Sequence, residues 1–150
     1  MRKIFVAIFL SVILMLTGVA PAFAVDKDPV TKSQAALLFD SKTGKVLFEK
    51  NSTKQIPPAS LTKIVTCIIV LEELEMDRKV TIPAEATGFE GNNIELVEGE
   101  ILTVEQLINA TMVYSANDAA VALAIEVAGS EAEFVKMMNK KVKGWGAEHT

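Results

Sequence analysis

Two residues that can act as a nucleophile and a base stand three positions apart in the segment Pro58-Ala59-Ser60-Leu61-Thr62-Lys63. A serine hydroxyl is a weak nucleophile that needs a base, and a lysine amine can serve when it is neutral. Residues three apart on a helix share a face, with Cβ atoms about 5–6 Å apart, so Lys63 can reach the Ser60 hydroxyl. Apolar residues around the pair favour the neutral amine. The segment therefore predicts a serine nucleophile with its own base.

A second candidate site follows 55 residues after Ser60, in the segment Tyr114-Ser115-Ala116-Asn117. A second hydroxyl near a serine–lysine pair can relay a proton to a leaving group. An amide can contact both a substrate carbonyl and the lysine. Ser115 and Asn117 are therefore candidates for the relay and the substrate contact.

Both segments also admit purely structural interpretations. Ser60 could be only an N-cap and Lys63 only a surface residue of the first turn, while Asn117 could simply cap the next helix and Ser115 fill the turn. A lysine so early in a helix opposes the helix dipole, which disfavours the structural interpretation of the first pair. The spacing of the two segments, with helices between them, favours a shared site.

The rest of the pattern predicts a hairpin followed by a block of helices, an α+β arrangement within the broad α/β class. The expected elements are strands 35–39 and 46–48, a helix 60–75, a strand 79–82, and helices 103–113, 117–128 and 130–142. The first helix is apolar on nearly every face, which predicts a buried central helix. Capping boxes are expected at Thr103 and Ser130. A lone hairpin needs further strands or a helix to pack on.

Residues 1–24 have the layout of a secretory signal peptide. A basic start at Arg2 and Lys3 precedes the apolar run 4–16 and the small-x-small site Ala22-Phe23-Ala24. The alternative, a membrane anchor, is disfavoured because a span takes roughly 20 residues. We expect cleavage after Ala24, an exported, extracytoplasmic product, a linker over 25–34, and a catalytic domain over 35–150 without membrane contact.

Composition excludes several classes of function. The formal net charge is −4 over 150 residues, and the signal peptide removes two of the basic residues, which argues against nucleic acid and anionic lipid as partners. The only cysteine, Cys67, excludes an internal disulfide. Its place in an apolar helix predicts a buried, inert thiol.

Together these segments resemble the D-alanyl-D-alanine carboxypeptidases of the low-molecular-mass penicillin-binding proteins, serine peptidases with a Ser-x-x-Lys motif. The resemblance runs from about Ser33 onward. Its segments are Leu38-Phe39-Asp40, Gly44-Lys45-Val46-Leu47, Asn51, 58–63, Leu96-Val97-Glu98-Gly99-Glu100, 103–107 and 115–120. It implies a β-lactamase/transpeptidase-like fold, of which this chain holds the N-terminal hairpin and helical block.

The resemblance also implies roles for the site residues. Ser60 would be the acylated nucleophile, Lys63 its base, Ser115 the proton relay and Asn117 a substrate contact. The implied substrate is a peptidoglycan stem peptide ending in D-Ala-D-Ala, whose last D-alanine leaves through an acyl-enzyme and water. Penicillins and other β-lactams would acylate Ser60 as substrate mimics. No metal or organic cofactor is implied.

The third motif of the family, Lys-Thr-Gly, is expected on a strand after the helices. Lys42-Thr43-Gly44 precedes Ser60 and is interpreted as a hairpin turn. Without a later copy before Thr150, we expect this chain to be weakly active or inactive. Two alternatives remain: a class A β-lactamase, whose second motif is usually Ser-Asp-Asn where Ala116 stands here, and a non-catalytic fragment that binds a partner.

Overall fold

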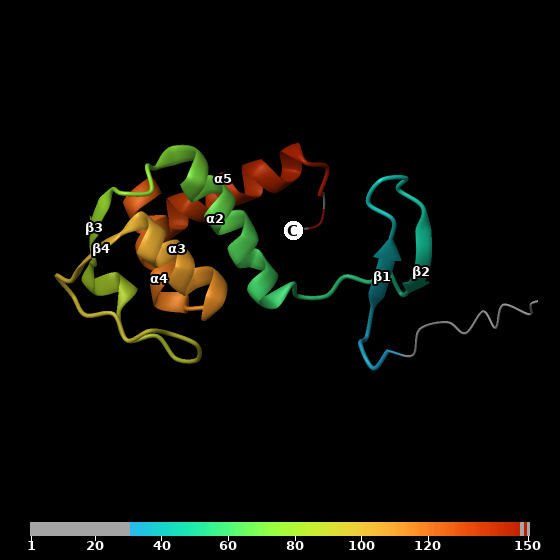
Figure 1. The fold of residues 1–150 in the computed structure, drawn as a ribbon, viewed down its shortest axis with the longest axis horizontal. Helices are drawn as coiled ribbons and strands as arrows, with labels where there is room; N and C mark the ends of the chain where they lie inside the picture. Colours follow the sequence, from blue (N-terminus) through green and yellow to red (C-terminus); the bar gives the residue numbers. More distant parts are fainter. Residues whose placement is uncertain (1–30, 148, 150) are drawn as a thin grey trace, which may run out of the picture. The chain divides into compact units, whose positions relative to one another are not determined.

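The computed structural model describes residues 31–147 and 149. The signal peptide, its cleavage site after Ala24 and most of the linker 25–34 lie outside these residues and stay predictions. None of the described helices is long and apolar enough to cross a membrane. The chain divides into two compact units, Met1–Lys54 and Gln55–Thr150, which are described separately below (Figure 1).

The first unit is the predicted hairpin. Strand β1 (Ala36–Phe39) pairs antiparallel with β2 (Val46–Lys50), and the register shifts by a bulge between Leu38 and Phe39. Large apolar side chains of both strands remain about half exposed: Leu37, Leu38, Phe39, Val46 and Leu47. This exposure agrees with the expectation that the hairpin needs further packing partners.

The turn of the hairpin is built around Asp40. Its Oδ1 atom accepts hydrogen bonds from the N–H groups of Thr43 at 2.8 Å and Lys42 at 2.9 Å. These backbone donors, that of Thr43 first, lower the pKa of the Asp40 carboxyl. Gly44 has φ of 69°, a left-handed conformation that suits glycine. The prediction that Lys42-Thr43-Gly44 forms a turn is confirmed.

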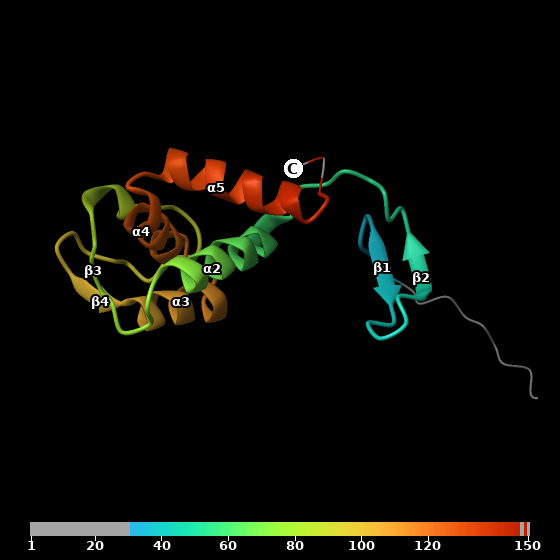
Figure 2. The same ribbon diagram turned by 90° about the horizontal axis from the view of Figure 1, so that it is seen from above.

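The second unit is a helical block. Its helices are α2 (Thr62–Glu73), α3 (Val104–Val113), α4 (Asn117–Ala128) and α5 (Glu131–Gly144). Figure 2 shows α2 between α5 and α3, with α4 behind them. Apolar side chains from all four helices and the adjoining strands form one core, including Ile69, Val70, Val80, Ile82, Val104, Leu107, Leu123 and Phe134.

Local chemistry explains where these helices begin. Thr103 and Gln106 form the predicted capping box at the start of α3, with bonds in both directions. At the start of α5 only half of the second box is present, since the Ser130 hydroxyl accepts from the N–H of Glu133. The Glu133 carboxylate pairs instead with Lys136, one turn further along the helix.

A second small sheet was not predicted in full. Strand β3 (Lys79–Thr81) pairs antiparallel with β4 (Ile101–Thr103), and the short 3₁₀ turn η2 (Ala84–Ala86) follows β3. Strand β4 could not be identified from the sequence, because it has only three residues and the last of them, Thr103, already caps α3. Three residues are too few to show the alternating pattern of a strand.

The helix expected over residues 60–75 differs from the prediction in two ways. Residues Ala59–Leu61 form a 3₁₀ turn, η1, and α2 begins only at Thr62. The helix is not buried on every face, because the side chains of Ile64 and Leu71 are 43% and 53% exposed. Among the described residues, α2 packs against α3, α4 and α5 and leaves the rest of its surface exposed. Cys67 is buried as predicted, and burial raises the pKa of its thiol.

We predict that Leu107→Ala lowers the free energy of unfolding by about 2–5 kcal/mol, because it opens a cavity in the core. The control is Leu71→Ala, which removes the same atoms from an exposed position and is expected to cost about 0.5 kcal/mol or less. Chemical denaturation of both variants measures the difference. Equal losses would contradict the assigned core.

Candidate active site

The turn η1 presents Ser60 to solvent at the beginning of α2. Ala59 has φ of 49°, an uncommon left-handed conformation for a residue with a side chain, and it directly precedes Ser60. The N-cap position of α2 is Leu61, and it makes no side-chain capping bond. The interpretation of Ser60 as a simple N-cap is therefore wrong.

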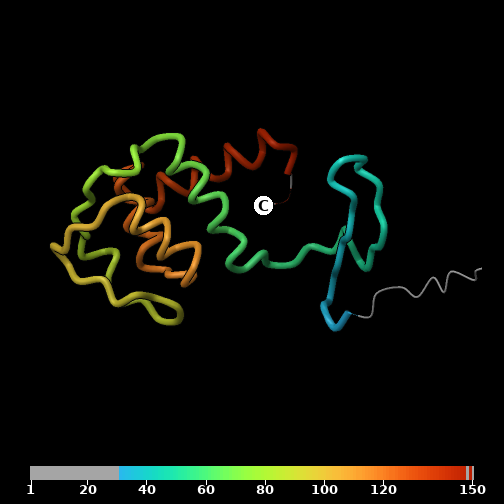
Figure 3. The backbone as a smooth tube through the Cα atoms, viewed as in Figure 1, coloured from blue at the N-terminus to red at the C-terminus, as the bar shows by residue number. Residues whose placement is uncertain are grey.

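The turn between α3 and α4 supplies the second set of side chains. Ser115 has φ of 56°, while the next residue, Ala116, is fully buried and donates its N–H to the carbonyl of Ala110 at 3.2 Å. Helix α4 then begins at Asn117, whose side chain does not cap it. Figure 3 traces the backbone of this turn, which lies beside η1.

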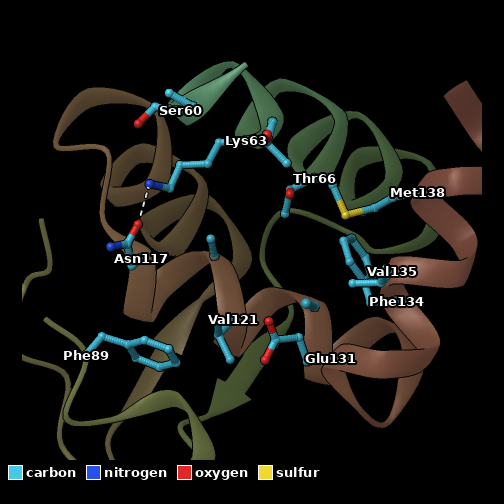
Figure 4. Close-up of a pocket in the computed structure, with 14 residues that line it drawn as sticks. Ser60, Lys63, Thr66, Phe89, Asn117, Val121, Glu131, Phe134, Val135 and Met138 are labelled. Carbon is cyan, nitrogen blue, oxygen red and sulfur yellow. Dashed lines mark hydrogen bonds between the residues drawn. The ribbon is translucent and has the colours of Figure 1, made fainter. Parts of the chain in front are cut away.

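Lys63 connects the two segments. Its Nζ atom, which is partly buried, lies 2.7 Å from the carbonyl oxygen of Ser115, 3.2 Å from Ser115 Oγ and 2.6 Å from Asn117 Oδ1. Figure 4 shows the Lys63 side chain extended toward Asn117. Lys63 is therefore not a free surface residue, and Asn117 is not merely a helix cap.

Ser60 joins this set through Ser115. The two hydroxyl oxygens are 2.9 Å apart, whereas the described hydrogen bonds include none between Lys63 Nζ and Ser60 Oγ. The direct contact suggested by the three-residue spacing is absent because Ser60 precedes the first residue of α2. The four predicted residues do meet, in the order Ser60, Ser115, Lys63, Asn117.

This contact set suits both protonation states of the lysine. An ammonium has three N–H donors for the three oxygens, whereas a neutral amine has two donors and one lone pair. The carbonyl of Ser115 and the amide oxygen of Asn117 can only accept. The hydroxyl of Ser115 can either accept or donate, so the lone pair of a neutral Lys63 would face it.

A pocket of about 510 Å³ opens beside these groups. Ser60, Lys63 and Asn117 line one end, and Figure 4 shows the apolar side chains of Val121, Phe134, Val135 and Met138 along the rest. Among the described residues, no group of three or more His, Cys, Asp or Glu could hold a metal.

The loop 88–99 contributes contacts that the sequence did not suggest. The carbonyl of Asn92 accepts from the Asn117 N–H at 2.8 Å, and that of Glu90 accepts from Asn117 Nδ2 at 3.3 Å. Main-chain carbonyls carry no residue-type pattern, so spacing could not reveal them. The one available sign was Asp118, a charged residue in the first turn of a largely apolar helix, which is 1% exposed and bonded to the same loop.

Comparison with known proteins gives concordant matches. The chain is 39% identical over 148 residues to D-alanyl-D-alanine carboxypeptidase DacF of Bacillus subtilis (strain 168), covering 92% of this chain and 38% of the relative. It is 36% identical to D-alanyl-D-alanine carboxypeptidase DacC of Escherichia coli (strain K12), covering 86% and 36%.

A solved structure agrees. The crystal structure of the D-alanyl-D-alanine carboxypeptidase DacD from Francisella tularensis superposes with a TM-score of 0.81 at 29% identity, covering 91% of this chain and 34% of that one. The chain thus spans well under half of the length of each of these three proteins. Its hairpin and helical block correspond to part of the penicillin-binding, transpeptidase-like fold.

The family match covers almost the whole chain. Residues 22–150 match the peptidase S11 family, described as D-alanyl-D-alanine carboxypeptidase. The match favours the carboxypeptidases over the class A β-lactamases considered from the sequence. From its motifs, its fold and this match, the chain belongs to the D-alanyl-D-alanine carboxypeptidase family of serine peptidases.

Proposed function

We propose that this chain carries the acylation machinery of a serine-type D-Ala-D-Ala carboxypeptidase, with Ser60 as the nucleophile. The observation that supports this most strongly is the continuous set of contacts from Ser60 Oγ through Ser115 Oγ to Lys63 Nζ. A nucleophile, a relay and a base within hydrogen-bond distance are the geometry that acyl transfer requires.

The proton would follow these contacts. As Ser60 Oγ attacks a carbonyl carbon, its proton passes to Ser115 Oγ, and the proton of Ser115 passes to the neutral Lys63 amine. When the tetrahedral intermediate collapses, the same groups return a proton to the departing amine nitrogen. The 2.9 Å and 3.2 Å separations support each transfer without a large movement.

Asn117 would serve both the lysine and the substrate. Its Oδ1 atom holds Lys63 at 2.6 Å, and an amide nitrogen has two N–H donors. One of these points to the carbonyl of Glu90. In the proposed mechanism the other would donate to a substrate carbonyl beside Ser60.

Membership of the family supports a proposal about the substrate class. We propose that peptidoglycan stem peptides ending in D-Ala-D-Ala are the substrates and that β-lactams acylate Ser60 in their place, outside the cytoplasm.

The proposal predicts that penicillin adds one adduct to the purified chain and that Ser60→Ala abolishes it, because the variant has no nucleophilic oxygen. Intact-mass spectrometry after incubation measures both, with circular dichroism to confirm that both proteins fold. An adduct of equal yield in Ser60→Ala would contradict the proposal, as would a folded wild-type chain that stays unmodified. An adduct that clears within seconds would instead favour a β-lactamase.

The left-handed conformation of Ser115 generates a second prediction. Ser115→Gly and Ser115→Ala both remove the relay hydroxyl, and each should slow acylation about 100-fold or more. Only glycine removes the backbone strain, so Ser115→Gly should be more stable than Ser115→Ala by about 1 kcal/mol.

Thermal unfolding and the rate of adduct formation, measured on the same preparations, check the two effects separately. Acylation at the wild-type rate in either variant would show that Ser115 Oγ is no relay. Greater stability of the alanine variant would show that the backbone at Ser115 is not strained.

A further inference from the structure

We propose that Asp118 is a positioning residue for this site. Its buried carboxylate fixes the loop 88–99 against the first turn of α4, and the loop in turn orients the Asn117 amide toward Lys63. The inference rests on the proposed function, because it assigns to Asp118 a part in the same acylation.

The environment of Asp118 shows a carboxylate satisfied by backbone donors. Its side chain is 1% exposed, and it takes part in no salt bridge among the described residues. Oδ2 accepts from the N–H groups of Ile94 and Leu96, each at 3.1 Å, and Oδ1 accepts from that of Ala119 at 2.8 Å. A buried charge is costly unless hydrogen bonds of this kind compensate it.

These bonds determine the path of the loop. The N–H groups of Ile94 and Leu96, two residues apart, both donate to one carboxylate oxygen of Asp118. The Leu96 side chain is buried in the core. The Asn93 amide closes the other half of the loop by donating to the carbonyls of Phe89 at 2.8 Å and Gly91 at 3.2 Å. Hydrogen bonds thus hold one half of the loop to Asp118 and close the other half on itself.

The loop then acts on Asn117. Its carbonyls at Asn92 and Glu90 accept from the main-chain and side-chain nitrogens of Asn117. Gly91, with φ of 85°, passes so close that an added Cβ would lie 3.5 Å from Asn117 Nδ2. With the amide nitrogen held on this side, the amide oxygen faces Lys63.

The first turn of α4 has no capping side chain at its N-cap position. Its N-cap, Ala116, provides no side-chain hydrogen bond, and Asp118 Oδ1 accepts from the third N–H of the helix instead. Asn117 thus faces the site and Asp118 faces the core. The loop connects the two through hydrogen bonds.

The test is Asp118→Asn, which keeps the size of the side chain but replaces one acceptor oxygen by an NH₂ group facing backbone donors. Hydrogen exchange of the Ile94, Leu96 and Asn117 amides should speed up about 10-fold to 100-fold, as expected for the loss of a charge-assisted bond. The rate of penicillin acylation should fall by a similar factor. The matched control is Val104→Ala. This residue is also buried, but it is the first residue of α3, at the opposite end of that helix from the Ser115 turn.

A double-mutant cycle separates positioning from general destabilisation. In an Asn117→Ala background, Asp118→Asn should change the acylation rate by less than about twofold, because its effect passes through Asn117. A fully additive effect would overturn the proposal. A loss of acylation no greater than that of Val104→Ala would overturn it too.

The exchange measurement does not depend on catalysis. If the wild-type chain is not acylated, the proposed function fails, and exchange still decides the structural claim. Faster exchange at Asn117 in Asp118→Asn would then support the link from Asp118 to Asn117. Unchanged exchange at Asn117 would overturn it.

Discussion

The site depends on the hydrogen bonds of the Lys63 amine to three oxygens. It requires the first turn of α2 to lie within reach of the turn between α3 and α4, residues more than 50 positions away in the sequence. Packing of α2 against α3 and α4 provides that approach. Because two of the three oxygens only accept, the third contact, with Ser115 Oγ, is where a proton can be exchanged.

Two residues with strained backbone conformations belong to the segments around this amine. Ala59 and Ser115 both have left-handed φ values. Ala59 directly precedes Ser60, and Ser115 lies in the turn between α3 and α4 that Ser60 contacts. Such conformations cost roughly 1–3 kcal/mol each and persist where the surroundings hold them. Here the buried Ala116 and the bonded loop beside α4 hold the second turn, so the helical core and the loop together maintain the geometry of the hydroxyl groups.

Much of this arrangement could be predicted from side-chain patterns. The hairpin, the bounds of α4 and the capping box at Thr103 follow from periodicity and residue type. The meeting of Ser60, Lys63, Ser115 and Asn117 is expected instead from the spacing of the two motifs together with the family resemblance. Features that depend on the backbone could not be predicted. Ser60 lies in a 3₁₀ turn and reaches Lys63 through the Ser115 hydroxyl. The main-chain carbonyls of the loop 88–99 have no residue-type pattern. Strand β4 is too short to show the alternation of a strand.

The most direct test of the central claim is the rate of Ser60 acylation by penicillin in Lys63→Arg compared with the wild-type chain. Arginine keeps a positive charge and donors for the carbonyl of Ser115 and the amide of Asn117, but it cannot become a neutral base. We expect a folded variant whose acylation is slower by about 100-fold or more, because the base is lost. Acylation within about threefold of the wild-type rate would show that Lys63 only holds the two segments together.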